Sequence, residues 1–222
     1  MRRSLELDDR LSRAAALFPA CEYGADIGAD HGRLSCFLLE SGKAERMCVA
    51  DISADSLQKA EILIQEHGLA GRADFRVGDG LNVLDRPAQA IAILGMGGHT
   101  LSGILRDGRE KLRGAALVLS AHTDMGLVRQ TLAELDYRIE TEEIAFAANR
   151  FYVLLRAARG SEPLSEKQLC VGPRLMESIQ QYYPEYLRWR AGLASKKQTP
   201  QGKQEFAWLK EEQERVRDGQ ND

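Results

Sequence analysis

The chain has 222 residues, of which 44% are hydrophobic and 28% charged, with 30 basic and 33 acidic side chains and a net charge of -3. This composition excludes collagen, a mucin-like stalk and a wholly disordered chain, because it holds enough apolar material to bury a core. The length suits one main domain of about 150 residues with a short second element.

The charge is unevenly distributed along the chain. Residues 1–150 hold 18 basic and 23 acidic side chains, a net -5, whereas residues 151–203 hold 9 and 4, a net +5. Nucleic-acid-binding domains usually show an overall basic excess, but a local excess is enough to attract a polyanion. Charge alone favours a solvated helix surface for residues 151–203 and leaves a polyanion contact open.

Metal-binding and targeting patterns are not evident in the sequence. The four cysteines form no CxxC pair and no metal-like spacing with histidine, so we expect reduced, buried thiols and no metal. No apolar run approaches the roughly 20 residues of a membrane span, and the first nine residues lack the apolar core of a signal peptide. We therefore expect a cytoplasmic protein that meets no membrane.

The first half of the chain alternates between helix and strand. An amphipathic helix is expected over residues 4–18. A short strand then ends at Ile27, and the helix that follows ends at Gly42. A second strand, residues 47–50, ends on Asp51, and Ser53 can cap the next helix. A third strand covers residues 74–77.

The second half continues this alternation and then changes. Residues 90–94 are continuously apolar, as in a strand covered on both faces. A fifth strand (115–119) precedes another helix, and segments 137–146 and 150–157 can pair as an antiparallel hairpin. The pattern predicts an α/β fold with a mostly parallel sheet and helices on both faces. A linker near Gly160 and two or three helices follow, so we expect a sheet domain over 1–160 and a helical domain over 161–222.

Glycines and carboxylates cluster at the ends of the predicted parallel strands, where open sheets bind ligands. The candidate residues, in chain order, are Asp26, Gly28, Asp30, Asp51, Ile52, Asp79, Gly80, Gly95, Met96 and Gly97. Glycine allows close approach to the backbone, and a carboxylate that ends the second strand can accept hydrogen bonds from both hydroxyls of a ribose. The pattern indicates a cofactor that contains a nucleoside.

The charges at these positions favour one such cofactor. Asp30 stands where the second glycine of a dinucleotide G-x-G-x-x-G motif would meet a pyrophosphate, and Arg33 stands at the third. S-adenosylmethionine has a ribose and an adenine but no phosphate, and its amine and sulfonium cations suit an acidic pocket. The turn at 28–32 alone would equally fit a tight strand-to-helix connection, but Asp51 and Asp79 follow it in order.

Four short motifs at these strand ends resemble those of a known family: residues 26–31 (DIGADH), 50–52 (ADI), 78–81 (GDGL) and 95–98 (GMGG). They resemble the bacterial tRNA (adenine-22-N1)-methyltransferase family of class I S-adenosylmethionine-dependent enzymes. The similarity runs from about residue 10 to 156, and residues 171–175 resemble the start of the family's helical C-terminal domain. Residues 33–35 (RLS) replace the family's usual Tyr-Leu-Pro, and residues 120–122 (SAH) replace Gln-Pro-Asn.

The resemblance implies a Rossmann-like class I methyltransferase sheet with a helical C-terminal appendage. It also implies transfer of a methyl group to N1 of an adenine in tRNA, with S-adenosylhomocysteine released. The altered segment Ser120-Ala121-His122 motivates a second reading, a methyltransferase for a small molecule or another RNA. A third reading is a cofactor-binding RNA-interaction protein without catalysis.

Each candidate residue for the cofactor and the chemistry has an alternative role. Asp51 is expected to bind the ribose, or else to cap a helix beside Ser53. Asp79 would accept from the cofactor's adenine amino group. Asp30 and His31 would face the methionine end or the reacting methyl; Asp30 could take a proton from the product or merely hold the turn. His122 is a catalytic candidate or a surface loop residue.

Basic residues supply the substrate candidates. Arg10 would meet the cofactor carboxylate or an RNA phosphate, or else pair with Glu6 along a helix. Phosphate contacts on the tRNA body are expected from four residues of the basic stretch: Arg188, Arg190, Lys196 and Lys197. The neighbouring aromatics, including Trp189 and Trp208, are expected to pack helices together and not to stack on bases.

Overall fold

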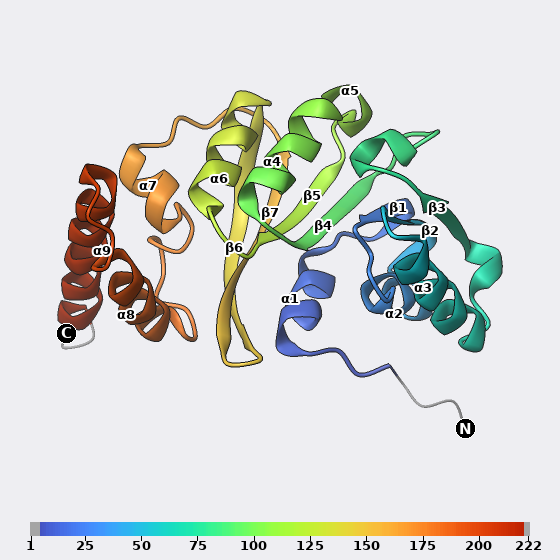
Figure 1. Cartoon of the computed structure of the whole chain (residues 1–222), viewed down its shortest axis with the longest axis horizontal. Coiled ribbons are helices and arrows are strands. Elements are labelled where there is room, and N and C mark those ends of the chain that lie inside the picture. The colour runs from blue at the N-terminus through green and yellow to red at the C-terminus, as the bar shows by residue number, and fades with distance from the viewer. Residues whose placement is uncertain (1–4, 220–222) are drawn as a thin grey trace.

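The computed structural model describes residues 5–219 and contains one seven-stranded sheet (Figure 1). The strand order is β3-β2-β1-β4-β5-β7-β6; neighbours among β1 to β5 run parallel, and β7 is antiparallel to both β5 and β6. The strands are β1 (Cys21–Ile27), β2 (Ala44–Asp51), β3 (Ala73–Val77), β4 (Ala90–Met96), β5 (Ala116–Ala121), β6 (Tyr137–Ala147) and β7 (Arg150–Arg159). This confirms the predicted α/β class, with its mostly parallel sheet and C-terminal antiparallel hairpin.

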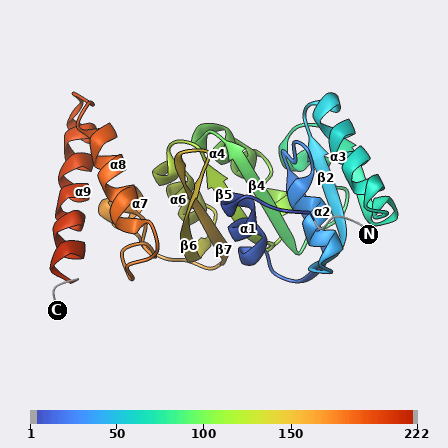
Figure 2. The same ribbon diagram turned by 90° about the horizontal axis from the view of Figure 1, so that it is seen from below.

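Helices cover both faces of the sheet. The apolar side chains of α1, α2 and α3 pack on one face, and those of α4, α5 and α6 pack on the other. Helices α7, α8 and α9 stand beyond β6 at one end of the molecule (Figures 1 and 2). The helices are α1 (Asp9–Leu17), α2 (Arg33–Glu40), α3 (Ala54–Glu66), α4 (Gly98–Asp107), α5 (Arg109–Leu112), α6 (Met125–Glu134), α7 (Glu166–Val171), α8 (Tyr183–Ala194) and α9 (Pro200–Asp218).

Strand β4, at the centre of the sheet, has no polar side chain along its buried length because both of its faces are covered. In β4, Ile91 and Ile93 enter the core beneath α4 and α6, whereas Ala92 enters the core beneath α1 to α3. All three side chains are fully buried. Successive strand residues point to opposite faces, so a run without polar residues is what a two-sided core requires.

Several element boundaries differ from the sequence expectation by a few residues, and two of these differences have a clear physical reason. The first helix begins at Asp9, because the Asp8 carboxylate accepts a hydrogen bond from the Leu11 backbone N–H at 2.8 Å and caps it; residue 4 lies outside the described residues. Strand β5 continues to Ala121, because Ser120 pairs with Leu94 in the parallel ladder and Ala121 pairs opposite β4 as well. Ser120 and Ala121 are therefore buried strand residues.

The hairpin between β6 and β7 turns within two residues. Ala148 and Asn149 both adopt positive φ, 48° and 59°, which suits the right-handed twist of the paired strands. Because β7 returns beside β5, its first residues lie at the same edge of the sheet as the ends of the parallel strands. This return places Arg150 and Tyr152 beside the loop that follows β5.

The C-terminal helices share a continuous core with the sheet. Val171, Leu187 and Leu209, from α7, α8 and α9, are fully buried in the same apolar cluster as residues of β5 and β7. In the described residues, no helix is long and apolar enough to cross a membrane.

All four cysteines carry free thiols. Cys36 and Cys48 are buried, and burial raises the pKa of each to about 11. Cys21 and Cys170 are half-buried, so the expectation of buried thiols is only partly met. The described part of the chain contains no group of three or more His, Cys, Asp or Glu residues that could hold a metal ion.

Candidate active site

The candidate site lies where the strand order reverses. Strand β1 has β2 on one side and β4 on the other, and the connections from β1 and β4 leave in opposite directions across the sheet. Ligands of open parallel sheets bind at this point, beyond the carboxyl ends of the strands. Here those ends are Ile27, Asp51 and Met96.

The turn between β1 and α2 exposes backbone to this point. The N–H groups of Gly28 and Ala29 both donate to the Ala50 carbonyl at 2.9 Å, which fixes the turn against β2. Gly28 has φ +76°, and a Cβ placed there would meet only the Met96 methyl at 3.0 Å. The space over Gly28 is thus otherwise open and floored by backbone, as close approach of a ligand requires.

Gly32 closes the same turn for a different reason. It caps α2 with φ +67°, and a Cβ there would lie 2.6 Å from the Ala60 side chain of α3. Any side chain at this position would push α2 and α3 apart. Gly32 therefore fixes the packing beneath the turn, while Gly28 provides the open surface.

The Asp51 carboxylate links two turns. One oxygen accepts from the Ser53 N–H at 2.8 Å, and the other accepts from the Asp30 N–H at 3.0 Å. The cap of α3 is Ser53, whose hydroxyl accepts from the Ser56 N–H, so Asp51 is not the capping residue. Beside it, the Ile52 side chain is 71% exposed. An ionised carboxylate keeps further lone pairs for two hydroxyls, and exposed Ile52 offers an apolar surface to a flat ring.

Asp26 lies beneath the turn. It is 3% exposed and accepts a hydrogen bond from the Ser35 hydroxyl at 2.7 Å. Burial raises its pKa to about 6; bonds from the Ser35 side chain and backbone oppose this rise, and the nearby Asp51 charge adds to it. Asp26 can therefore influence a ligand only through its charge, across the protein atoms that cover it, and not by direct contact.

The third strand end is more open. Asp79 precedes the short helix η2 (Gly80–Val83), and its side chain makes no capping bond there and is exposed. Gly80 has φ +56° and packs against Ile104. The exposed carboxylate of Asp79 can thus meet a ligand at the end of β3.

The end of β4 packs tightly on the loop after β5. The Gly98 N–H donates to the Thr123 carbonyl at 3.1 Å, and a Cβ on Gly98 would lie 2.6 Å from the carbonyl oxygens of Thr123 and Asp124. The His122 N–H donates to the Met96 carbonyl at 2.8 Å. Gly97 lies between these contacts. The two loops are thus held together by backbone hydrogen bonds and close packing.

A polar cluster surrounds Gly95 at this edge. A Cβ on Gly95 would stand 3.5 Å from an Arg10 guanidinium nitrogen and 3.7 Å from Nε2 of His122. Arg10 lies over the Tyr152 ring at 5.3 Å, and the His122 ring meets Tyr152 edge-on at 5.7 Å. Nε2 of His122 is buried and has no hydrogen-bond partner among the described residues. Burial, Arg150 and Arg10 lower the pKa of His122, so its ring is neutral near pH 7.

Sequence reasoning did not find Tyr152 and Arg150. Nothing near them in the sequence resembles a ligand motif, and only the antiparallel return of β7 brings them beside His122. A partial signal exists in the alternation of β7, which points Tyr152 and Phe151 to opposite faces of the sheet.

Asp30 and His31 form a pair on the surface of the β1–α2 turn. The Asp30 carboxylate lies 2.8 Å from Nδ1 of His31, and both side chains are more than half exposed. Asp30 adopts φ 50°, a left-handed conformation that is uncommon outside glycine. A proton on Nδ1 directed at Asp30 leaves Nε2 of His31 as an acceptor that faces solvent.

The four predicted phosphate contacts differ in their surroundings. Arg188 and Lys196 are exposed on the surface of the helical end, and Arg188 pairs there with the exposed Glu185 at 3.0 Å. Lys197 pairs with Glu205 at 2.7 Å, and Arg190 pairs with the same carboxylate while donating to the Tyr186 hydroxyl at 2.9 Å. Arg190 thus joins α8 to α9 and is only 18% exposed.

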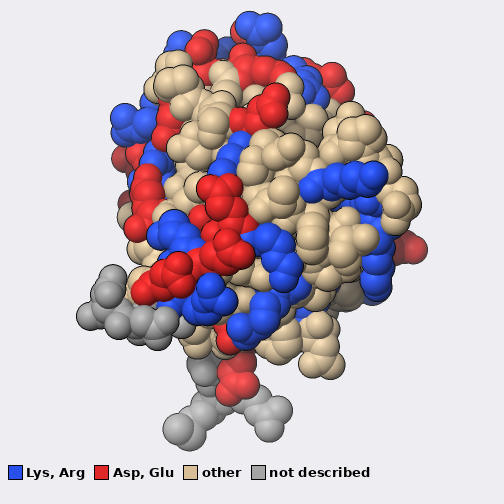
Figure 3. Space-filling view, turned by 90° about the vertical axis from the view of Figure 1, so that its left-hand side faces the viewer, with Lys and Arg blue, Asp and Glu red and all other residues tan. Residues whose placement is uncertain are grey.

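The local basic excess is largely balanced in the folded chain. Residues 204–222 carry six acidic and three basic side chains, so residues 151–222 together have a net charge of only +2. On the end of the molecule shown in Figure 3, acidic and basic side chains intermingle. The surface there is mixed, without the continuous basic face that the count for 151–203 alone suggests.

Comparison with known proteins shows the family of this chain. The family model for tRNA (adenine(22)-N(1))-methyltransferase matches residues 24–217, which is most of the chain. The chain belongs to this family. A curated relative, the tRNA (adenine(22)-N(1))-methyltransferase of Bacillus subtilis, is 32% identical over 158 residues, which cover 70% of this chain and 66% of that protein. The aligned segment thus spans just under two thirds of the Bacillus protein.

Solved structures agree with the family. The crystal structure of the B. subtilis m1A22 tRNA methyltransferase is 26% identical and covers 97% of this chain and 99% of its own, with a TM-score of 0.81. A Streptococcus pneumoniae protein described as a putative tRNA (m1A22) methyltransferase, in complex with S-adenosylmethionine, has a TM-score of 0.87 at 23% identity and covers 94% and 100%. The second likeness concerns the fold.

The two departures from the family's usual motifs have structural counterparts. At the first, Ser35 stands where the family usually has proline, and its hydroxyl and backbone both bond to buried Asp26, which a proline could not do. At the second, Ser120 and Ala121 are buried within β5, so His122 is the residue of this segment that reaches the site.

Proposed function

We propose that this protein transfers a methyl group from S-adenosylmethionine to N1 of an adenine in tRNA and releases S-adenosylhomocysteine. The observation that carries the proposal is the sheet edge at the strand-order reversal, where the open Gly28 backbone, the Asp51 carboxylate and the His122 loop lie at the carboxyl ends of parallel strands. Membership of the family supports the reaction and the choice of substrate.

The residues at this edge of the sheet fit the proposed cofactor. Asp51 would receive the ribose hydroxyls, and exposed Ile52 would lie against the adenine. Asp79 would accept from the adenine amino group. The open surface over Gly28 would hold the methionine part, with Asp26 beneath it to favour the cationic amine. When bound, S-adenosylmethionine supplies a methyl group on a sulfonium, which an adenine N1 lone pair displaces in line.

The chain's own part in this reaction is alignment. N1 of neutral adenine already carries a lone pair, so no residue must remove a proton before attack. The packed loops at Gly95 to Gly98 and His122 would hold the base edge at a fixed distance. Methylation leaves a positive charge on the base, which the Asp30 carboxylate at the turn can stabilise.

Binding of tRNA would use the edge of the sheet and the helical end. N1 lies on the pairing edge of adenine, so the base must be unpaired or flipped before it can enter. Within this proposal, residues 1–160 hold the cofactor, and 161–222 contact tRNA through exposed cations such as Arg188 and Lys196. Arg10 would serve a cofactor carboxylate or a phosphate at the site. The enzyme would act in the cytoplasm, where its substrate is.

The test is a methyl-transfer assay with labelled cofactor and unmodified bulk tRNA, followed by mass spectrometry of the nucleosides. We expect label in 1-methyladenosine. If tRNA stayed unlabelled while S-adenosylhomocysteine still bound, the tRNA methyltransferase assignment would fail. Label in another RNA or a small molecule under the same conditions would instead support the second reading.

A further inference from the structure

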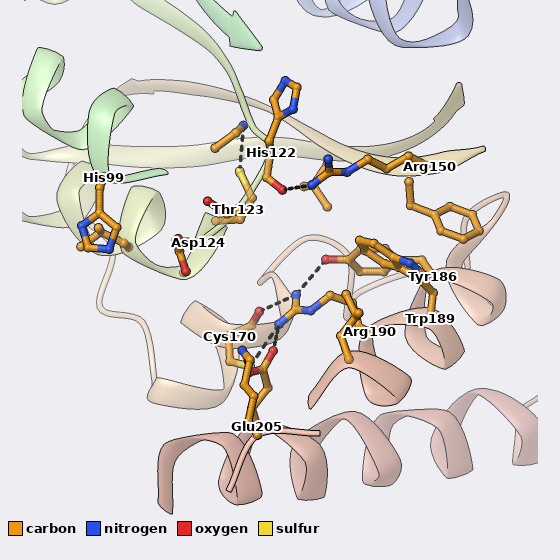
Figure 4. A pocket seen from close by; sticks show the side chains of 18 residues that line it. His99, His122, Thr123, Asp124, Arg150, Cys170, Tyr186, Trp189, Arg190 and Glu205 are labelled. Atoms are coloured by element: carbon orange, nitrogen blue, oxygen red, sulfur yellow. Dashed lines mark hydrogen bonds and ion pairs between the residues drawn. The ribbon is translucent and has the colours of Figure 1, made fainter. Parts of the chain in front are cut away.

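A cavity of about 690 Å³ lies between the sheet and the C-terminal helices. Its walls come from the end of β5 and the loop after it, the starts of α4, α6 and β7, and the helical end with α7, α8 and α9. In Figure 4, His122 and Arg150 lie on one side of the opening, and Tyr186, Trp189, Arg190 and Glu205 lie on the other. The volume falls in the range of pockets that hold small organic groups, roughly 300–1,000 Å³.

One wall of this cavity is aromatic. Phe151 of β7 and Trp189 of α8 have ring centroids 5.8 Å apart, and Tyr186 lies 6.2 Å from Trp189. Tyr186 is buried, whereas Phe151 and Trp189 are partly exposed toward the opening. Trp189 thus does more than the helix packing expected from the sequence, because part of its indole faces the cavity.

The positive charges around the cavity are not equivalent. Arg190 and Lys197 both pair with Glu205, so their charge is balanced within the chain. Arg150 has no carboxylate partner among the described residues. Its guanidinium donates to the His122 carbonyl at 2.7 Å and lies 5.9 Å from the Tyr152 ring centroid. Arg150 is therefore the cation best able to receive an anion from outside.

His122 connects this cavity to the proposed methyl-transfer site. Its carbonyl faces Arg150 at the cavity, while its ring points away from the opening and toward Gly95 (Figure 4). A ligand in the cavity and a base over Gly95 would thus lie on opposite sides of His122.

We propose that this cavity binds one unpaired nucleotide of the substrate RNA, next to the adenine that is methylated. Its base would stack against Trp189 and its phosphate would meet Arg150. Proteins recognise unpaired RNA by stacking bases on aromatic rings and by contacting phosphates with arginine. The inference rests on the proposed function, since it takes tRNA as the substrate.

The experiment uses Trp189 as its own reporter. The chain has two tryptophans, so a Trp208→Phe variant leaves Trp189 as the only indole. Titration of this variant with an unmodified tRNA transcript should quench its fluorescence with the same midpoint as filter binding. Saturable tRNA binding without any change in Trp189 emission would overturn the inference.

Charge variants provide the second measurement. Arg150→Gln should weaken tRNA binding about threefold to tenfold and lower the salt slope by about 1, with S-adenosylhomocysteine affinity unchanged. Lys59→Gln, which removes an exposed charge on α3 far from the cavity in sequence and in Figure 1, is the matched control. Equal effects of the two changes would contradict a specific role for Arg150.

The outcomes separate this inference from the proposed function. If tRNA is methylated normally but its binding leaves Trp189 emission unchanged and Arg150→Gln leaves tRNA affinity unchanged, the nucleotide pocket is wrong and the enzyme assignment stands. If the protein neither binds nor methylates tRNA, both fail. Thermal unfolding of each variant checks that its fold is intact.

Discussion

Replacing Asp26 with Asn should stabilise the free protein in a pH-dependent way. The carboxyl is buried and its pKa is about 6, whereas its ordinary value is 3.8. About two pH units separate these two pKa values, so the charged form of the carboxyl destabilises the folded state by about 3 kcal/mol relative to the neutral form. Because the folded-state pKa is raised, the folded state prefers the protonated acid. The cost of the buried charge is therefore absent below pH 3.8 and complete above pH 6.

Asparagine removes this cost because it cannot ionise and can still accept from Ser35. Asp26→Asn should raise the free energy of unfolding by up to about 3 kcal/mol at pH 8 and by about half as much at pH 5. Equilibrium urea denaturation at both pH values measures the difference. Asp107→Asn, the same chemical change at the exposed end of α4, is the matched control.

The same variant should bind S-adenosylmethionine more weakly, since the carboxylate beneath the turn favours the cofactor's cationic amine. A gain in stability with a loss of affinity is the signature of a residue kept for function. The reasoning about burial is refuted if the stability difference between variant and wild type is the same at pH 5 and pH 8.

Three further changes test other parts of the structure. Asp51→Asn should weaken S-adenosylhomocysteine binding at least tenfold, about 1.4 kcal/mol or more, in calorimetry, and undiminished affinity would remove the ribose role. Gly98→Ala should lower stability by about 1–3 kcal/mol and slow methyl transfer, because its Cβ meets two carbonyl oxygens at 2.6 Å; an unchanged melting temperature would show that the loops can separate. Arg129 and Glu142 form a fully buried ion pair. Arg129→Met should lower the free energy of unfolding by about 3–5 kcal/mol, because it leaves the buried Glu142 carboxyl without its partner. In urea denaturation the double change with Glu142→Leu should recover most of this loss, and no recovery would argue against the pair as its cause.

Much of the sheet could be predicted because its signals are local. Strand β4 is apolar along its buried length since both of its faces are covered, Gly28 directly follows β1, and Asp51 ends β2. Parallel strands bring their carboxyl ends to one edge, so short motifs far apart in sequence point to one site. The same logic predicts the place of His122 directly after β5.

The rest depends on tertiary packing that leaves no local pattern. Tyr152 and Arg150 reach the site only because β7 runs back beside β5. The basic excess counted over residues 151–203 does not predict a basic surface, because Glu205, just beyond those residues, pairs with both Arg190 and Lys197. Such ion pairs depend on how α8 packs on α9, and this packing cannot be predicted from the spacing of residues along the chain.

The most direct test of the central claim is methyl transfer to two matched tRNA transcripts that differ only in the base at position 22. With adenine at 22, we predict one 1-methyladenosine at that position and stoichiometric S-adenosylhomocysteine. With guanine at 22, we predict no methylation at that site and unchanged cofactor binding. Equal labelling of the two transcripts, or no labelling of either while the cofactor still binds, would contradict the account.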